Sequence, residues 1–215
     1  PIPLELGNLT QLVHLSLYNN SLTGSIPSTL SQLVNLTSLL LSFNQLEGAI
    51  PAELGNLTQL TRYYLSNNFI TGSIPPTLSQ LVNLTHLFLD FNQIQGLIPS
   101  TLGQLQNLTI LFLDSNRIQG PIPEEFGNLK SLHILYLSNN LLTSSIPPTL
   151  GRLENLTHLF LDSNRIQGPI PEEFGNLKSL HILYLSNNLL TSSIPPTLGR
   201  LENLTHLFLD SNQIE

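Results

Sequence analysis

Leucine recurs along this chain in a pattern of apolar and polar positions that repeats every 24 residues. A representative unit, residues 105 to 128, reads LQNLTILFLDSNRIQGPIPEEFGN. Within it Leu111 and Leu113 alternate with other residues, and this period of two predicts a β-strand whose leucines face inward. A unit this short cannot bury its own core, so we expect successive units to stack into a solenoid.

The units cover the whole chain. Eight full repeats occupy residues 9–200, with partial repeats at 1–8 and 201–215. Nine strands spaced by about 4.8 Å are expected to form a parallel sheet roughly 40 Å long. Because the chain opens on the tail of a repeat, we expect residues 1–215 to be one solenoid taken from inside a longer protein, without terminal caps.

Three polar or special positions mark the turns of each unit. An asparagine is expected to close each strand by bonding backbone groups at the bend, and it recurs at Asn20, Asn44, Asn68, Asn92, Asn116, Asn140, Asn164, Asn188 and Asn212. A Gly-x-Ile-Pro segment follows, in which Ser144 and Ser192 replace the glycine and so make local distortion possible. Residues 123–128 are expected to form a short helical turn.

Tyr63 stands where leucine is expected, and its hydroxyl would need a hydrogen-bond partner if it were buried.

The unit fits LxxLxxLxLxxNxLxGxIPxxLGx and resembles the plant-specific leucine-rich repeat over essentially the whole chain. That family includes the ectodomains of plant receptor-like kinases and receptor-like proteins, and polygalacturonase-inhibiting proteins. The resemblance implies an α/β-type solenoid with a parallel sheet on its concave face and short helical or 3-10 turns on its convex side. It also implies a second short strand in each unit and ligand binding along the inner surface.

The outward positions of the strands form columns on the concave face. The central column begins with Ser16 and Leu40 and then becomes an aromatic ladder of Tyr64, Phe88, Phe112, Tyr136, Phe160, Tyr184 and Phe208. Such rings either stiffen the sheet by packing on each other or form an apolar binding surface. We favour binding, because an exposed apolar patch is otherwise an aggregation liability.

Polar columns flank the ladder on both sides. One contains His86, His158 and His206 among isoleucines. The other is an acid column of Asp90, Asp114, Asp162 and Asp210, in which one serine separates each of the last three aspartates from the next. An apolar centre with a polar rim is typical of interfaces. Acids along one edge favour a partner that carries basic groups.

The same side chains give little support to catalysis or metal binding. His158 and Asp162 lie four residues apart on one strand, about 13 Å, which is too far to share a metal. Asp90 and Asp114 are expected near the spacing of about 5 Å found in retaining glycosidases, but on an open face. We therefore expect no catalytic residues, no metal and no cofactor.

Composition limits which classes of partner and which cellular compartment are expected for this chain. The net charge is −7 with no basic stripe, so nucleic acid is not an expected partner. No apolar run is long enough to span a bilayer, so we expect no membrane contact by these residues. Without cysteine, the compartment is inferred from N-glycosylation sequons, which predict a secreted or cell-surface glycoprotein and lie at Asn8, Asn19, Asn35, Asn56, Asn83, Asn107, Asn155 and Asn203.

Residues 111–164 are identical to residues 159–212, which indicates a recent duplication, deliberate engineering, or a sequence inferred by copying a unit. Three functions remain open on the sequence. The leading one is an ectodomain fragment that binds a peptide or protein, with or without a co-receptor. The alternatives are a structural repeat protein that self-associates end to end into filaments, and an inhibitor of secreted microbial enzymes.

Overall fold

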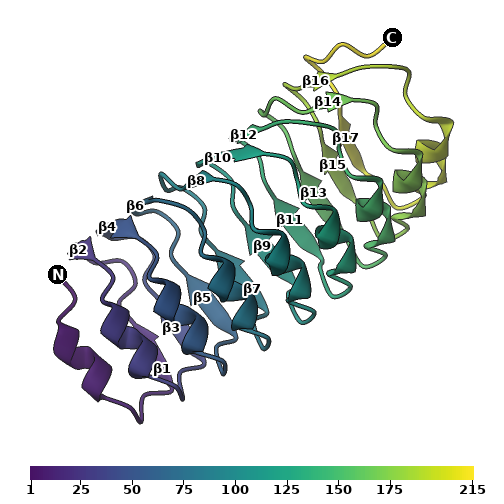
Figure 1. Cartoon of the computed structure of the whole chain (residues 1–215). Helices are drawn as coiled ribbons and strands as arrows, with labels where there is room; N and C mark the ends of the chain where they lie inside the picture. The colour runs from purple at the N-terminus through teal and green to yellow at the C-terminus, as the bar shows by residue number, and fades with distance from the viewer.

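The outward and inward alternation of each unit produces a three-residue strand, and nine of these strands pair in chain order into one parallel sheet. The computed structural model describes all residues 1–215. The sheet runs the length of the molecule (Figure 1). Its strands are β1 (His14–Ser16), β3 (Ser38–Leu40), β5 (Arg62–Tyr64), β7 (His86–Phe88), β9 (Ile110–Phe112), β11 (Ile134–Tyr136), β13 (His158–Phe160), β15 (Ile182–Tyr184) and β17 (His206–Phe208).

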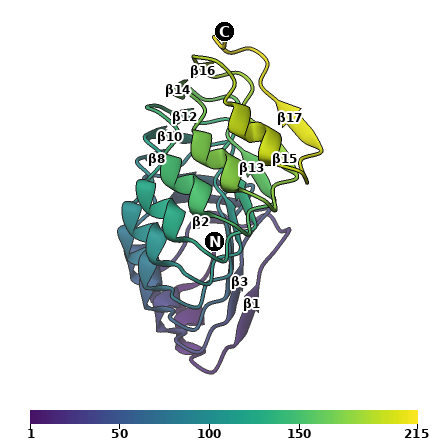
Figure 2. The same ribbon diagram turned by 90° about the vertical axis from the view of Figure 1, so that its right-hand side faces the viewer.

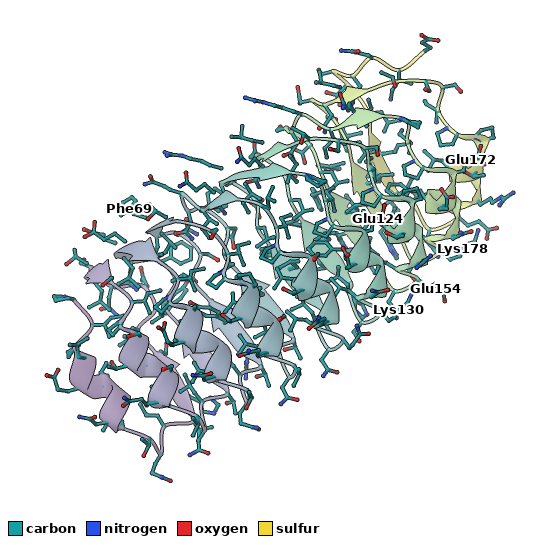
Figure 3. The ribbon with its side chains drawn as sticks, viewed as in Figure 1. Phe69, Glu124, Lys130, Glu154, Glu172 and Lys178 are labelled. Atoms are coloured by element: carbon teal, nitrogen blue, oxygen red, sulfur yellow. The ribbon has the colours of Figure 1, made fainter.

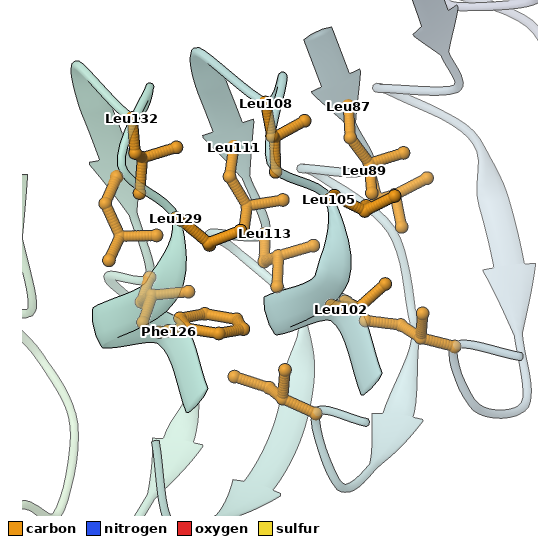
Figure 4. Close-up of a cluster of buried hydrophobic side chains, with 14 of the residues drawn as sticks. Leu87, Leu89, Leu102, Leu105, Leu108, Leu111, Leu113, Phe126, Leu129 and Leu132 are labelled. Carbon is orange, nitrogen blue, oxygen red and sulfur yellow. The ribbon is translucent and has the colours of Figure 1, made fainter. Parts of the chain in front are cut away.

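Pairing is in register by repeat position, so each side chain meets its equivalent in the neighbouring strand. Leu111 pairs with Leu87 on one side and with Leu135 on the other. The inward leucines belong to a continuous core of 53 buried residues, part of which is shown in Figure 4. Full burial of one leucine contributes about 1.5–3 kcal/mol. The core therefore stabilises each repeat through its neighbours.

A five-residue 3-10 helix follows each Ile-Pro segment, as the family resemblance implies. Each begins directly after a proline in extended conformation. A Cβ on Gly127, within η6, would clash with the carbonyl oxygen of Thr149 in the next repeat, so glycine allows the turns to stack closely. The helices are η1 (Leu4–Asn8), η2 (Ser28–Gln32), η3 (Ala52–Asn56), η4 (Pro76–Gln80), η5 (Ser100–Gln104), η6 (Glu124–Asn128), η7 (Pro148–Arg152), η8 (Glu172–Asn176) and η9 (Pro196–Arg200).

Strands of two to five residues after the asparagine turn form three small parallel sheets along one edge. Ser144 and Ser192 have φ angles of 65° and 66° and stay in the left-handed region that Gly120 and Gly168 occupy at 79°. The pairing of the small strands is nevertheless interrupted between β12 and β14, next to Ser144. The backbone amide of Gln167 still bonds the carbonyl of Ser144. These strands are β2 (Thr23–Ser25), β4 (Gln45–Ala49), β6 (Phe69–Thr71), β8 (Gln95–Gly96), β10 (Arg117–Gly120), β12 (Leu141–Leu142), β14 (Gln167–Gly168) and β16 (Leu189–Leu190).

The asparagine column links consecutive repeats, which confirms its expected structural role. The Asn140 side-chain amide donates to the carbonyls of Leu137 and Ser138 in its own turn and of Leu113 in the preceding repeat. Its Oδ1 accepts from the backbone amide of Ile118 at 2.9 Å. One buried side chain thus satisfies four backbone groups that the bends leave unpaired.

Seen from the end, the nine-stranded sheet and the 3-10 helices lie on different sides of the solenoid (Figure 2). The outer face of the sheet is therefore free of covering elements. Each helix has five residues, and none combines the length and apolar character that a bilayer-crossing helix requires. The open sheet face is the surface on which the predicted columns lie.

Candidate binding face

The aromatic ladder exists as a continuous column of touching rings. One ring comes from each strand from β5 to β17, so the parallel register stacks them in chain order. Centroids of successive rings lie 4.2 to 4.6 Å apart. The rings are half-buried, except Phe208 in the last strand, which is 42% exposed. The ladder thus offers apolar ring surface to solvent along most of the sheet.

Ring orientation changes midway along the ladder. The rings of Tyr64, Phe88, Phe112 and Tyr136 are nearly parallel, with interplanar angles from 6° to 14°. From Tyr136 to Phe208 the angles are 58° to 64°. Each such pair contributes about 0.5–1.5 kcal/mol beyond area burial, so the rings stiffen the sheet and also leave their outer edges available for contact.

The acid column is held in place by serine hydroxyls. Ser66, Ser138 and Ser186 each donate to the aspartate of the following repeat, which is Asp90, Asp162 and Asp210 respectively. Ser115 and Ser163 donate to the carboxylate of the preceding residue, Asp114 and Asp162. No lysine or arginine is among these donors. The carboxylates are therefore oriented but not neutralised by an ion pair.

Burial makes ionisation less favourable for two neighbouring aspartates on this face. Burial raises the pKa of Asp114 to about 6, with further contributions from the charges of Asp90 and Asp162. Burial also raises the pKa of Asp90, although the hydrogen bond from Ser66 acts in the opposite direction. Asp90 is only 8% exposed, so it lies deeper than the rim position expected for it. Asp114, Asp162 and Asp210 carry the accessible negative charge of this column.

The histidine column lies on the other flank of the ladder. His86 and His158 are half-buried, and each ring nitrogen Nδ1 contacts the hydroxyl of the preceding threonine at 2.8 Å. Burial lowers the pKa of both rings, with smaller contributions from Arg62 at His86 and from His181 at His158. His206 is exposed in the last strand. His86 and His158 therefore add neutral, partly apolar surface beside the rings near neutral pH.

Most other charged side chains lie away from the open sheet face. Figure 3 shows the helix-bearing side, where it labels Glu124, Lys130, Glu154, Glu172 and Lys178. On the face itself, Arg62 in β5 is the one lysine or arginine in the three columns. The face is thus apolar along its centre and acidic along one edge from β7 to the C-terminal end.

Sequence reasoning missed a second set of aromatic side chains at the edge beside the acid column. Phe43 and Phe91 have left-handed φ angles of 59° and 50°, a costly conformation for a bulky residue, and are 45% and 54% exposed. Phe69, labelled in Figure 3, is 52% exposed. The signal was present in the sequence, because other repeats place asparagine or serine at the positions of Phe43 and Phe91.

All eight sequon asparagines are exposed. Five of them also donate their side-chain amide to a backbone carbonyl of the preceding repeat, at 2.8 to 3.0 Å, and these are Asn35, Asn83, Asn107, Asn155 and Asn203. A glycan replaces one of the two amide hydrogens, so one donor remains for such a bond. These five asparagines therefore link neighbouring repeats, and their exposed side chains retain a second amide hydrogen.

Family models match most of the chain. A model described as a leucine-rich repeat region matches residues 91–214, and a model of the single leucine-rich repeat matches residues 11–33, 35–57 and 64–81. No curated protein sequence matches the chain. The first of these matches covers the candidate face from β9 onward.

Solved structures share the fold over nearly the whole chain. The plant peptide hormone receptor RGFR1 in complex with RGF2 is 43% identical with a TM-score of 0.98, over 99% of this chain and 34% of the receptor chain. The Arabidopsis receptor kinase HAESA, in complex with the peptide hormone IDA and the co-receptor SERK1, is 39% identical with a TM-score of 0.95, over 99% and 36%. The chain thus spans about a third of the length of these receptors.

The same fold also serves another function. A plant ice-binding protein is 35% identical with a TM-score of 0.83, over 93% of this chain and 65% of that protein. A shared solenoid therefore does not by itself assign a function, which must be argued from the face.

Proposed function

Since this chain belongs to the leucine-rich repeat family, we propose that it is the ligand-binding part of a plant receptor ectodomain and binds a peptide or protein along its aromatic ladder. The observation that carries this proposal is the ladder itself. Its seven successive rings remain partly exposed between polar columns on a face that no other element covers. Receptors of the same fold that bind peptide hormones support the proposal.

The proposed role is recognition without catalysis, in a secreted or cell-surface protein that carries N-linked glycans. The exposed sequons and the extracellular receptors among similar structures support this location. A co-receptor joins the ligand in the HAESA complex. By analogy, the exposed edge that includes Phe69 and Phe91 is available for a second protein beside a ligand on the ladder.

Selection from a displayed library of random peptides tests the proposal. We expect peptides selected on the native chain to lose at least about tenfold in affinity for a variant with Phe112→Ala and Phe160→Ala, because aromatic anchors dominate binding energy. The matched control is Val82→Ala with Leu97→Ala, two exposed apolar residues in other parts of the repeat. It should bind like the native chain, and circular dichroism should show that both variants are folded.

Two outcomes would contradict the proposal. One is a set of selected peptides that binds the ladder variant as tightly as the native chain. The other is a loss of binding by the Val82 and Leu97 control that equals the loss by the ladder variant. Either result would place recognition outside the ladder or assign the rings a purely structural role.

A further inference from the structure

We propose that the C-terminal half of the face binds a polyproline II peptide with a basic side chain at every third residue. This inference rests on the proposed function and specifies its ligand class. It follows from three observations about the strands from β9 to β17. These are the spacing of the acids, the spacing of the rings beside them, and the absence of any lysine or arginine in the three columns there.

The accessible acids recur on every second strand. Asp114, Asp162 and Asp210 follow β9, β13 and β17, and Ser138 and Ser186 occupy the equivalent positions after β11 and β15. Two strand spacings make about 9.6 Å at the backbone. The ring centroids, which lie above the sheet, are 4.2 to 4.6 Å apart, so two steps there make about 9 Å. Negative charge therefore repeats every 9 to 10 Å.

A polyproline II helix matches this repeat. It has three residues per turn with a rise of about 3.1 Å, so residues i and i+3 lie on one side about 9.3 Å apart. In a β-strand, side chains on one side recur every two residues, or about 6.6 Å, and fall out of step with the acids after one interval. The face thus favours one backbone conformation through its charge spacing.

While one side of the polyproline II helix faces the acid column, another side can pack on the aromatic ladder. The ladder lies two residues along the strand from the acid column, about 6.6 Å away, which a lysine side chain can span while its backbone rests on the rings. Proline-rich segments bind aromatic-lined surfaces in other recognition domains, because their conformation is preformed and costs little entropy. Here Phe112, Tyr136 and Phe160 would carry the proline rings.

Hydrogen bonds from serine hydroxyls fix the orientation of the carboxylates that would bind a cation. Asp162 accepts from Ser138 on one oxygen and from Ser163 on the other, so its orientation is set before a ligand arrives. Asp210 accepts from Ser186 in the same way as Asp162 from Ser138. Basic ligand groups would meet oriented, unpaired carboxylates, and this charge complementarity identifies the occupant as cationic.

Synthetic peptides provide the direct test. The probe is a fluorescent peptide of four Pro-Pro-Lys triplets with blocked ends, and the first control has the same composition with its lysines contiguous. We expect the triplet peptide to bind at least about fivefold more tightly by fluorescence anisotropy, because only it places all charges in register. A peptide of Gly-Gly-Lys triplets keeps the charge spacing but lacks the rigid backbone and should also bind more weakly.

A charge-matched pair of protein variants locates the interaction. Asp162→Asn removes the central charge but keeps an oxygen to accept from Ser138, and should weaken triplet binding by about three- to tenfold. Glu124→Gln removes one charge from the helix-bearing side and should leave binding unchanged. Equal binding of the triplet and contiguous peptides would overturn the inference, as would equal effects of the two variants.

Failure of this inference is separable from failure of the proposed function. If the triplet peptide does not bind but library-selected peptides still depend on Phe112 and Phe160, the ladder is a binding site for ligands of another class. If neither binds in a ladder-dependent way, both proposals are wrong.

Discussion

At the scale of single residues, a few side chains depart from the repeat and show what the repeat requires. Tyr63 replaces a core leucine in β5 and is completely buried. Its hydroxyl has no hydrogen-bond partner among the protein atoms, although the sequence predicted that it would need one. Burial accordingly raises the pKa of the Tyr63 hydroxyl. The ring fills the core position, but its hydroxyl is removed from water without a hydrogen bond, which lowers the stability of the fold.

Tyr63→Phe should therefore stabilise the chain. Removal of a buried unsatisfied hydroxyl recovers a penalty of about 1–3 kcal/mol, while the ring keeps its packing. Tyr64→Phe is the matched control, because Tyr64 is the adjacent residue and its side chain is half-buried on the ladder. Denaturant unfolding should show a higher midpoint for Tyr63→Phe alone. A lower midpoint for Tyr63→Phe would mean that the hydroxyl is paired in solution.

At the scale of elements, each repeat depends on a left-handed residue that lies in its second strand or just after it, before the Ile-Pro segment. Six repeats use glycine there, with φ from 74° to 83°, and Ser144 and Ser192 adopt the same region. A residue with a Cβ pays about 1–2 kcal/mol in that region. Contacts with the neighbouring repeats hold these serines in a left-handed conformation that is unfavourable for an isolated serine.

Ser144→Gly should stabilise the chain by about 0.5–1 kcal/mol, since relief of this strain exceeds the entropy that glycine adds to the unfolded state. Ser145→Gly is the matched control, because Ser145 is exposed and is not left-handed. The control should lose about 0.5–1 kcal/mol. Both values are available from urea unfolding, and equal effects of the two substitutions would contradict the strain argument.

The elements also show which features a sequence can predict. The 24-residue period and the Leu-x-Leu alternation place Leu111 inside and Phe112 outside, because parallel in-register stacking repeats each choice in every strand. The aromatic ladder follows from the same rule. The burial of Asp90 and the serine bonds to the acids could not be predicted, because they depend on side-chain packing between strands.

At the scale of the whole molecule, all four aspartates of the chain lie in the acid column of the proposed binding face, whereas its ten glutamates lie outside the three columns. The net charge is −7, and Asp114 lies beside the buried Asp90 on the face. The folded state raises the pKa of Asp114 from 3.8 to about 6. Protonation of Asp114 therefore favours the folded state, and this contribution is present below about pH 4 and lost as the pH rises through about 6.

Asp114→Asn should consequently raise stability at pH 7 and have little effect at pH 4. The variant should also show a smaller decrease in unfolding free energy between pH 4 and pH 7. Some decrease should remain, because the pKa of Asp90 is raised by burial as well. Thermal unfolding across this range checks the prediction against Glu124→Gln, which carries the same charge change on the other side. Parallel pH profiles for the native chain and Asp114→Asn would contradict it.

Hydroxyl-radical footprinting of the chain with a library-selected peptide tests the central claim most directly, because it reports the solvent access of each aromatic ring. The account predicts slower oxidation of Phe112, Tyr136 and Phe160 in the complex, with Phe69 and Phe91 unchanged. Protection of Phe69 and Phe91, with the ladder rings as reactive as in the free chain, would contradict it and place the binding surface at the edge of the solenoid.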